Sequence, residues 1–433
     1  MKTLLSTLSA ALIGAVTVST AVAHDEVPGD AQQQPIVLQG GTLHTVTNGV
    51  LTDSDLVFED GKITAIGKDL EVPGNAQVID VSGKHVYPGV IAMDTTLGLN
   101  EIEAVRATRD AREVGPVHPE VAGHIAFNAD SDVIPTVRYN GITHAQVVPE
   151  GSLIMGQSSL MHLDGWNYQD ALVSGEMGVH VSWPRTYVIN TWWERRSPEE
   201  QRKANEEARK ELMKVFADAK AYFDAKKADR DIDMDQRWEA MLGLFDGSKT
   251  LYVHANDKRQ MEQAIDVSRE YGFKLVLMGA RDAWRIADKL AELEVPVVFG
   301  SPFGLPGRDD EGYDQDFSTP AKLADAGVNF AISYPGYWDV RNLPFAAGHS
   351  VAFGLDQQKA LEAITLQPAK FMGVSDKLGS LDVGKSASLI VSEGDLLDPI
   401  GQSLTHMFID GRNVSLESRH TELYNKYQEK PAN

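Results

Sequence analysis

The chain has 433 residues, with 62 acidic and 40 basic side chains, a formal net charge of -22 and no cysteine. This length is sufficient for a large core, such as one α/β barrel with a small second domain. The acidic balance argues against a nucleic-acid partner and against binding to anionic lipid headgroups. The lack of cysteine excludes thiol nucleophiles and cysteine-ligated zinc in this chain.

The first residues have the pattern of a targeting segment. Lys2 precedes an apolar and small-residue run from Leu4 to Val22, and Ala21-Val22-Ala23 is an A-x-A cleavage site. No cysteine follows to carry a lipid anchor. We therefore expect a signal peptide over residues 1–23, cleaved near Ala23, and a periplasmic or secreted protein with no membrane insertion after cleavage. Residues 24–34 are expected to be a linker.

Short alternating segments then predict a small antiparallel β unit over residues 35–87. Asn48-Gly49 and Asp60-Gly61 supply the positive φ angles that tight hairpin turns require. Residues 378–418 show the same pattern, with a turn at Asp410-Gly411. Two β-rich ends around a helix-rich middle predict one composite β-sandwich domain, formed from both chain ends, with a second domain inserted. Residues 419–433 are expected to be a tail.

Residues 88–377 alternate apolar runs with amphipathic helices, which predicts an α/β fold of the (β/α)8 TIM barrel type. A charged helix is expected from Pro198 to Ala228, packing on the outside of the barrel. The expected strands are Val90 to Met93, Ile142 to Val148, Leu251 to His254, Lys274 to Met278, Val295 to Phe299 and Phe330 to Ser333.

One stretch carries a family resemblance. Tyr87 to Thr96 reads Y-P-G-V-I-A-M-D-T-T and resembles the P-G-x-I-D-x-H-x-H strand of the amidohydrolase superfamily. Met155 to Gly165 resembles the G-G-Q-x-A-V-I-K segment of its imidazolonepropionase-like members. The resemblance implies a barrel with a composite β domain, hydrolysis of carbon–nitrogen bonds, and a divalent metal held by side chains at the strand ends.

The metal positions implied by this resemblance are mostly substituted. Asp94 and Thr96 stand where the family has two histidines on its first strand, Met278 where it has the histidine of the sixth, and Pro335 where it has the aspartate of the eighth. Only His254, in the family's fifth strand, matches outright, and no lysine of the fourth strand can be placed. A thioether or a proline cannot replace these ligands at a hard divalent ion.

Two interpretations of the site remain. In the first, Asp94 and His254 hold one divalent, zinc-like metal together with a third donor at the barrel mouth. In the second, no metal binds. The candidates for the third donor are Glu101, Glu103 and His162. Alternatively, His254 is a hydrogen-bonded histidine at a strand end and Asp94 a solvated or capping carboxylate. His162 is also compatible with an ordinary strand histidine, and residues 97–109 with either a binding loop or a helix start.

Two functions follow. The first is hydrolysis of a carbon–nitrogen bond in a small-molecule substrate, such as a non-peptide or dipeptide amide. The second is a non-catalytic relative that binds a small molecule or forms a hetero-oligomer with an intact amidohydrolase; a homo-oligomer is compatible with both. The G-x-S-x-A stretch from Gly348 to Ala352 lies within an expected helix, without the preceding strand that a nucleophile elbow needs, so we reject a serine hydrolase.

Overall fold

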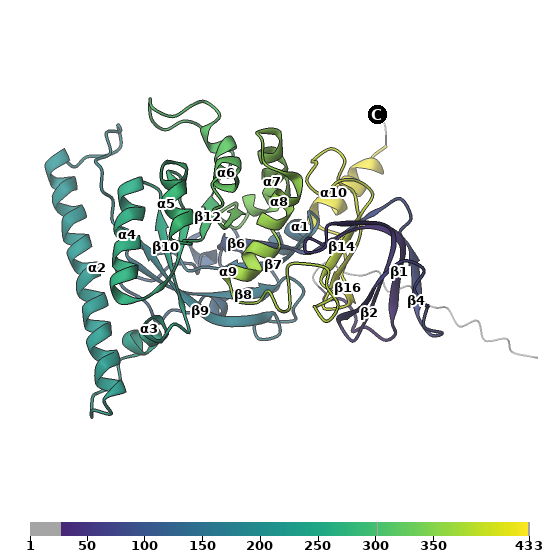
Figure 1. Ribbon diagram of the computed structural model, residues 1–433, viewed down its shortest axis with the longest axis horizontal. Coiled ribbons are helices and arrows are strands. Elements are labelled where there is room, and N and C mark those ends of the chain that lie inside the picture. The colour runs from purple at the N-terminus through teal and green to yellow at the C-terminus, as the bar shows by residue number, and fades with distance from the viewer. Residues whose placement is uncertain (1–26, 301, 432–433) are drawn as a thin grey trace, which may run out of the picture.

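The structure, a computed structural model, describes residues 27–300 and 302–431. The expected signal peptide, its cleavage site and the start of the expected linker lie outside the described residues. Two eight-stranded sheets account for the strands of the described part, and they lie in two separate regions (Figure 1). The arrangement confirms the predicted α/β barrel with a separate sheet domain.

The smaller sheet combines both ends of the chain. Its strands are β1 Ile36–His44, β2 Val50–Glu59, β3 Lys62–Gly67, β4 Gln77–Asp80, β5 His85–Pro88, β14 Leu389–Ser392, β15 Leu404–Ile409 and β16 Arg412–Asn413. They follow the order β16-β15-β14-β5-β1-β2-β3, with β4 beside β1. The two halves meet where β5 and β14 pair in antiparallel fashion, with Leu389 opposite Pro88.

The barrel strands follow one another in chain order. They are β6 Val90–Thr95, β7 Ile142–Val147, β8 Ile154–His162, β9 Leu172–Ser182, β10 Thr250–Ala255, β11 Lys274–Gly279, β12 Val297–Gly300 and β13 Phe330–Ser333. β13 returns to β6 through a parallel bridge between Thr95 and Gly336, so the barrel is nearly closed. The chain enters it through Gly89, where a Cβ atom would overlap the side chain of Thr143.

One strand differs from the parallel arrangement that a (β/α)8 barrel implies. β8 is antiparallel to both β7 and β9, whereas β9 to β13 are parallel. Residues 148–153 and 163–171 connect these strands, and a parallel connection needs a crossover of a dozen or more residues. The short connections therefore reverse β8, and its last residue lies at the end of the barrel where its neighbours begin.

Helices cover the outside of the barrel (Figure 1). They are α1 Val133–Arg138, α2 Pro198–Lys227, α3 Gln236–Asp246, α4 Lys258–Tyr271, α5 Ala287–Glu292, α6 Gln315–Asp325, α7 Leu343–Ala352, α8 Gln357–Ala363, α9 Leu366–Phe371 and, at the C-terminal end, α10 Arg419–Gln428. The expected outer helix is confirmed as α2. A capping box between Ser197 and Glu200 begins it, and it buries Leu212 and Phe216.

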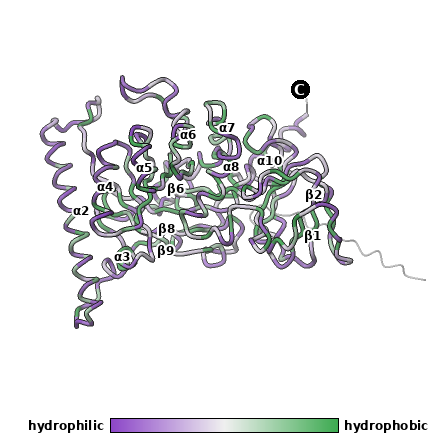
Figure 2. The backbone as a smooth tube through the Cα atoms, in the orientation of Figure 1, coloured by the Kyte–Doolittle hydropathy of each residue, from purple (hydrophilic) through white to green (hydrophobic). Residues whose placement is uncertain are grey.

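The apolar residues concentrate on the central strands, while much of α2 is hydrophilic (Figure 2). Inside the barrel, Ile91, Met93, Tyr252, Met278 and Val298 form one buried cluster. Alternate strand residues point outward to the helices, as the two-residue period of a strand requires. In the described part of the chain, no helix is long and apolar enough to cross a membrane.

Candidate active site

The candidate site lies at the C-terminal ends of the barrel strands, the end where barrel enzymes carry their active sites. Asp94 is near the end of β6 and has φ of 59°, a left-handed conformation that non-glycine residues rarely adopt. Its backbone N–H donates to Oε1 of Gln146 on β7 at 3.3 Å. Strained backbone of this kind persists where the surrounding structure imposes it, and it is frequent at functional sites.

Asp94 lies beside His254 of β10, so the structure brings these two predicted residues together. His254 Nδ1 is 3.8 Å from Asp94 Oδ1, and the side chains are 21% and 13% exposed. On its other side, His254 Nε2 is 3.0 Å from Nδ1 of His180 on β9. His180 is completely buried and stacks on Tyr252, with ring centroids 4.6 Å apart. The site is therefore a row of Asp94, His254 and His180 that reaches from the mouth into the barrel.

Sequence reasoning missed His180. It belongs to the fourth barrel strand, for which no family ligand could be placed. The available signal was the alternation in that strand: Val179 and Val181 pack outward, which turns His180 toward the barrel interior.

The burial of His180 and its hydrogen bonds indicate where the two histidines of this row carry their protons. Burial, with a contribution from His254, holds the pKa of His180 well below its ordinary value, so His180 is neutral. Its Nε2 is buried without a hydrogen-bond partner among the described residues. An orphaned buried N–H is rarer than an orphaned acceptor, so we assign the His180 proton to Nδ1, which donates to His254 Nε2. The proton of His254 then lies on Nδ1, which faces Asp94 Oδ1 at 3.8 Å, beyond hydrogen-bond distance.

The remaining family positions do not complete a metal centre. The Thr96 hydroxyl accepts a hydrogen bond from Asn100 Nδ2 at 3.1 Å. Met278 is fully buried in the apolar interior, and Pro335 is exposed beyond β13. Within residues 27–300 and 302–431, no group of three or more histidine, aspartate or glutamate side chains is placed to hold a metal. These residues therefore do not fit the divalent metal that the family resemblance implies.

The other candidate donors lie elsewhere. Glu101 accepts hydrogen bonds from Ser131 Oγ at 2.8 Å and Asn128 Nδ2 at 3.1 Å, and burial raises its pKa. Glu103 is exposed and lines a cavity at the mouth. The segment 97–109 is a loop with a short 3₁₀ turn at Arg106–Thr108, so the helix start considered as an alternative does not form.

The placement of His162 at the barrel mouth is wrong. His162 ends the reversed strand β8 and pairs with His144 near the start of β7, at the end of the barrel opposite the mouth. There it lines a cavity of about 900 Å³ together with Lys62 and Asp410 of the small sheet domain. His162 lies there because β8 runs antiparallel to β7 and β9, so its last residue is at the end of the barrel opposite the mouth.

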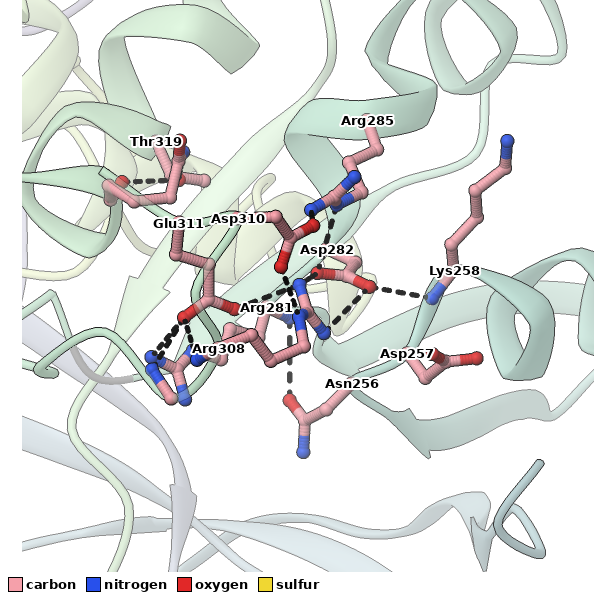
Figure 3. A network of polar contacts seen from close by, with 12 residues as sticks. Asn256, Asp257, Lys258, Arg281, Asp282, Arg285, Arg308, Asp310, Glu311 and Thr319 are labelled. Atoms are coloured by element: carbon pink, nitrogen blue, oxygen red, sulfur yellow. Dashed lines mark hydrogen bonds and ion pairs between the residues drawn. The ribbon is translucent and has the colours of Figure 1, made fainter. Parts of the chain in front are cut away.

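A network of ion pairs fastens the loop after β12 across the end of β11 (Figure 3). Asp282, which is 3% exposed, accepts hydrogen bonds from the Lys258 backbone N–H at 3.1 Å and from Arg308 Nη1 at 3.2 Å. Arg281 binds Glu311 at 3.2 Å and Asp316 at 3.1 Å. The carboxylates of Asp282, Glu311 and Asp316 are at most 5% exposed, whereas Arg281 and Arg308 are 32% and 39% exposed, so the network ties residues 308–316 to the segment that follows β11.

The fold and the site define an α/β barrel protein with a polar mouth and a sheet domain formed from both chain ends. Residues 259–417 match the model of the amidohydrolase family.

Known relatives cover the chain to different extents. Amidohydrolase tasK of Hapsidospora irregularis is 21% identical over 404 residues, which are 82% of this chain and 39% of that protein. The chain thus spans about two fifths of this relative. Imidazolonepropionase of Alkaliphilus metalliredigens is 22% identical over 394 residues, 79% of this chain and 84% of that protein. The crystal structure of an amidohydrolase from Thermotoga maritima MSB8 shares the fold, with a TM-score of 0.78, 24% identity, and coverage of 88% of this chain and 99% of that chain.

Proposed function

We propose that this protein hydrolyses a carbon–nitrogen bond of a small molecule at the barrel mouth, without the metal centre of its family. The observation that carries the proposal is the approach of Asp94 to His254 at 3.8 Å, with both side chains partly exposed. The match of residues 259–417 to the amidohydrolase family model supports the reaction class, and the strained φ of Asp94 supports a functional role for this residue.

In this mechanism Asp94 is the general base. His254 Nδ1–H faces its carboxylate at 3.8 Å, and His180 fixes the ring of His254 by donating to Nε2. Asp94 removes a proton from a water molecule as the water oxygen forms a bond to the substrate carbon. The carbon–nitrogen bond then breaks, and Asp94 returns the proton to the leaving nitrogen. General acid–base catalysis of this kind contributes about 10²- to 10⁴-fold to the rate.

A panel of N-acyl amino acids, dipeptides and cyclic imides tests the proposal through release of the amine. Asp94→Asn is expected to lower kcat by about 10²-fold or more. His180→Gln is expected to change the pH profile of kcat, because it removes only the positioning contact to His254. Chelator dialysis is expected to leave the rate unchanged. Activity that disappears with the chelator and returns with zinc would refute the metal-free mechanism, and hydrolysis of no compound would refute the reaction class.

A second candidate is a non-catalytic subunit that pairs with an intact relative. It is favoured by the hydrogen bond between His254 Nε2 and His180 Nδ1, which occupies one nitrogen of the only histidine that matches the family's metal positions. Co-expression with an amidohydrolase that retains both first-strand histidines, followed by size-exclusion chromatography, tests this candidate. Stoichiometric metal in the isolated chain, lost in His254→Ala, would refute it.

We also propose export to the periplasm or beyond, on the basis of residues 1–23 alone. Cell fractionation and N-terminal sequencing test it. A mature protein that begins at His24 is expected, and an uncleaved cytoplasmic chain would refute export.

A further inference from the structure

A cavity of about 610 Å³ opens beside the candidate active site. Its walls are the loop after β6 and the turn after β13, and Thr96 and Gly336 lie at its base, adjoining the bridge between Thr95 and Gly336. Thr96 follows Asp94 by two residues in the sequence, and Asp94 itself is not among the residues that line the cavity.

The cavity is lined by exposed side chains of both charge signs, which are solvated and have no protein partner among the described residues. Its charged lining residues include Arg106, Arg109, Arg112, Glu103, Glu113 and Glu150. Among residues 27–300 and 302–431, no ion pair or side-chain hydrogen bond engages any of these six groups. By contrast, the arginines of the network on the other side of the mouth, such as Arg281 and Arg308, are paired.

Unpaired charges of both signs limit the chemistry of a ligand. A simple anion would satisfy the arginines and face repulsion from the glutamates, and a simple cation would do the reverse. An arginine guanidinium fits a carboxylate bidentately, and a glutamate accepts hydrogen bonds from an ammonium group. A ligand with both groups can therefore satisfy both sets at once.

A second observation at the same cavity points to a ligand with an N–H group. Asn100 lines the cavity and is 8% exposed. Its Nδ2 donates to Thr96, but its Oδ1 is buried without a partner among the described residues. A buried acceptor without a donor carries a desolvation cost that an incoming N–H would remove. Tyr337 and Trp338 add apolar surface, and the Arg341 guanidinium lies over the Trp338 ring at 4.6 Å.

We propose that this cavity binds a zwitterion, namely an amino acid or short peptide with a free ammonium and a free carboxylate group. The arginines bind the carboxylate, the glutamates bind the ammonium, and Asn100 Oδ1 accepts from a ligand N–H. That the bound zwitterion is also the substrate rests on the proposed hydrolysis; binding itself does not.

Calorimetry with the dipeptide Ala-Phe tests the binding, using the Asp94→Asn protein so that hydrolysis does not interfere. N-acetyl-Ala-Phe lacks the ammonium group and Ala-Phe-amide lacks the carboxylate. Each is expected to bind at least about tenfold more weakly than Ala-Phe, because each leaves one set of cavity charges unpaired. Equal binding of the three compounds, or no binding of Ala-Phe, would overturn the proposal.

Two variants assign the ends of the ligand. Arg109→Gln is expected to weaken Ala-Phe about tenfold and to affect Ala-Phe-amide much less, since that ligand has no carboxylate to lose. Glu113→Gln is expected to weaken the binding of Ala-Phe about tenfold and to affect N-acetyl-Ala-Phe much less, since that ligand has no ammonium group to lose. Arg202→Gln, on the exposed face of α2, is the matched control and should change neither affinity. Equal weakening of both ligands by Arg109→Gln would overturn the assignment of the carboxylate.

The two proposals fail separately. Selective binding of Ala-Phe by Asp94→Asn, with no hydrolysis by the unmodified protein of any panel compound, would refute the proposed function and leave the zwitterion site standing. Hydrolysis of an amide by the unmodified protein, with no preference of the cavity for free termini, would refute the site and leave the function standing.

Discussion

His144, at the end of the barrel opposite the mouth, makes the free energy of unfolding depend on pH. His144 lies on β7, is 1% exposed, and contacts Thr143 Oγ1 through Nδ1 at 2.9 Å. Burial lowers its pKa from 6.5 to about 4, with a smaller lowering from His162, while Asp410 acts in the opposite direction. The folded state therefore resists protonation of this ring.

The sign and size of the effect follow from linkage. Between pH 6.5 and pH 4 the unfolded chain binds a proton at this position that the folded protein does not, so folding stability falls as the pH is lowered. The contribution of His144 is fully present above pH 6.5 and is lost as the pH falls toward its folded pKa. One pKa unit corresponds to about 1.4 kcal/mol, so lowering the pH from 7 to 5 removes about 2 kcal/mol.

Urea unfolding at pH 7 and pH 5 measures this loss. The wild-type protein should lose about 2 kcal/mol more than His144→Gln over this interval, whatever the stability of the variant at pH 7. His44, whose pKa burial also lowers to about 4, remains in both proteins, so the difference isolates His144. His420→Gln removes an exposed histidine and should retain the wild-type pH dependence. Identical pH dependence in the wild type and His144→Gln would refute the reasoning.

Three further substitutions test other features. Asp164→Asn removes a fully buried carboxylate that contacts Arg138 at 3.1 Å, and it should lower the free energy of unfolding by about 3 to 5 kcal/mol in urea. Asp94→Gly should raise stability by about 1 kcal/mol in thermal unfolding, since glycine tolerates the positive φ, and should abolish hydrolysis. Gly89→Ala forces a Cβ atom into the Thr143 side chain and should cost about 1 to 3 kcal/mol in urea.

Each substitution has a matched control. Asp233→Asn alters an exposed aspartate and should change stability by less than about 0.5 kcal/mol. Asp229→Gly also relieves a positive φ, of 52°, and should stabilise the protein without affecting activity. Gly74→Ala adds a Cβ where no atom lies within 4 Å. Full activity in Asp94→Gly, or equal effects of Gly89→Ala and Gly74→Ala, would contradict the reasoning.

Periodicity located most barrel strands closely. Lys274 to Met278 was expected and β11 spans Lys274–Gly279, and β13 has the expected limits Phe330–Ser333. The family resemblance also placed Asp94 and His254 together, as candidate metal ligands at the strand ends. His162 was misplaced because the expected strands did not include β8, whose antiparallel direction puts this residue at the opposite end of the barrel. The antiparallel direction of β8 follows from the short connections on either side of it, and these can be measured only once the limits of β7, β8 and β9 are known.

The sequence by itself determined the barrel, the composite sheet domain and the substitution of Thr96, Met278 and Pro335. These features depend on local patterning and on the chemistry of individual side chains, both of which are readable along the chain. Only the tertiary structure decided that His180 engages His254 and that arginines and glutamates face one cavity without pairing. The physical reason is that these contacts join residues distant in sequence, and their partners and burial are fixed only when the strands pack together.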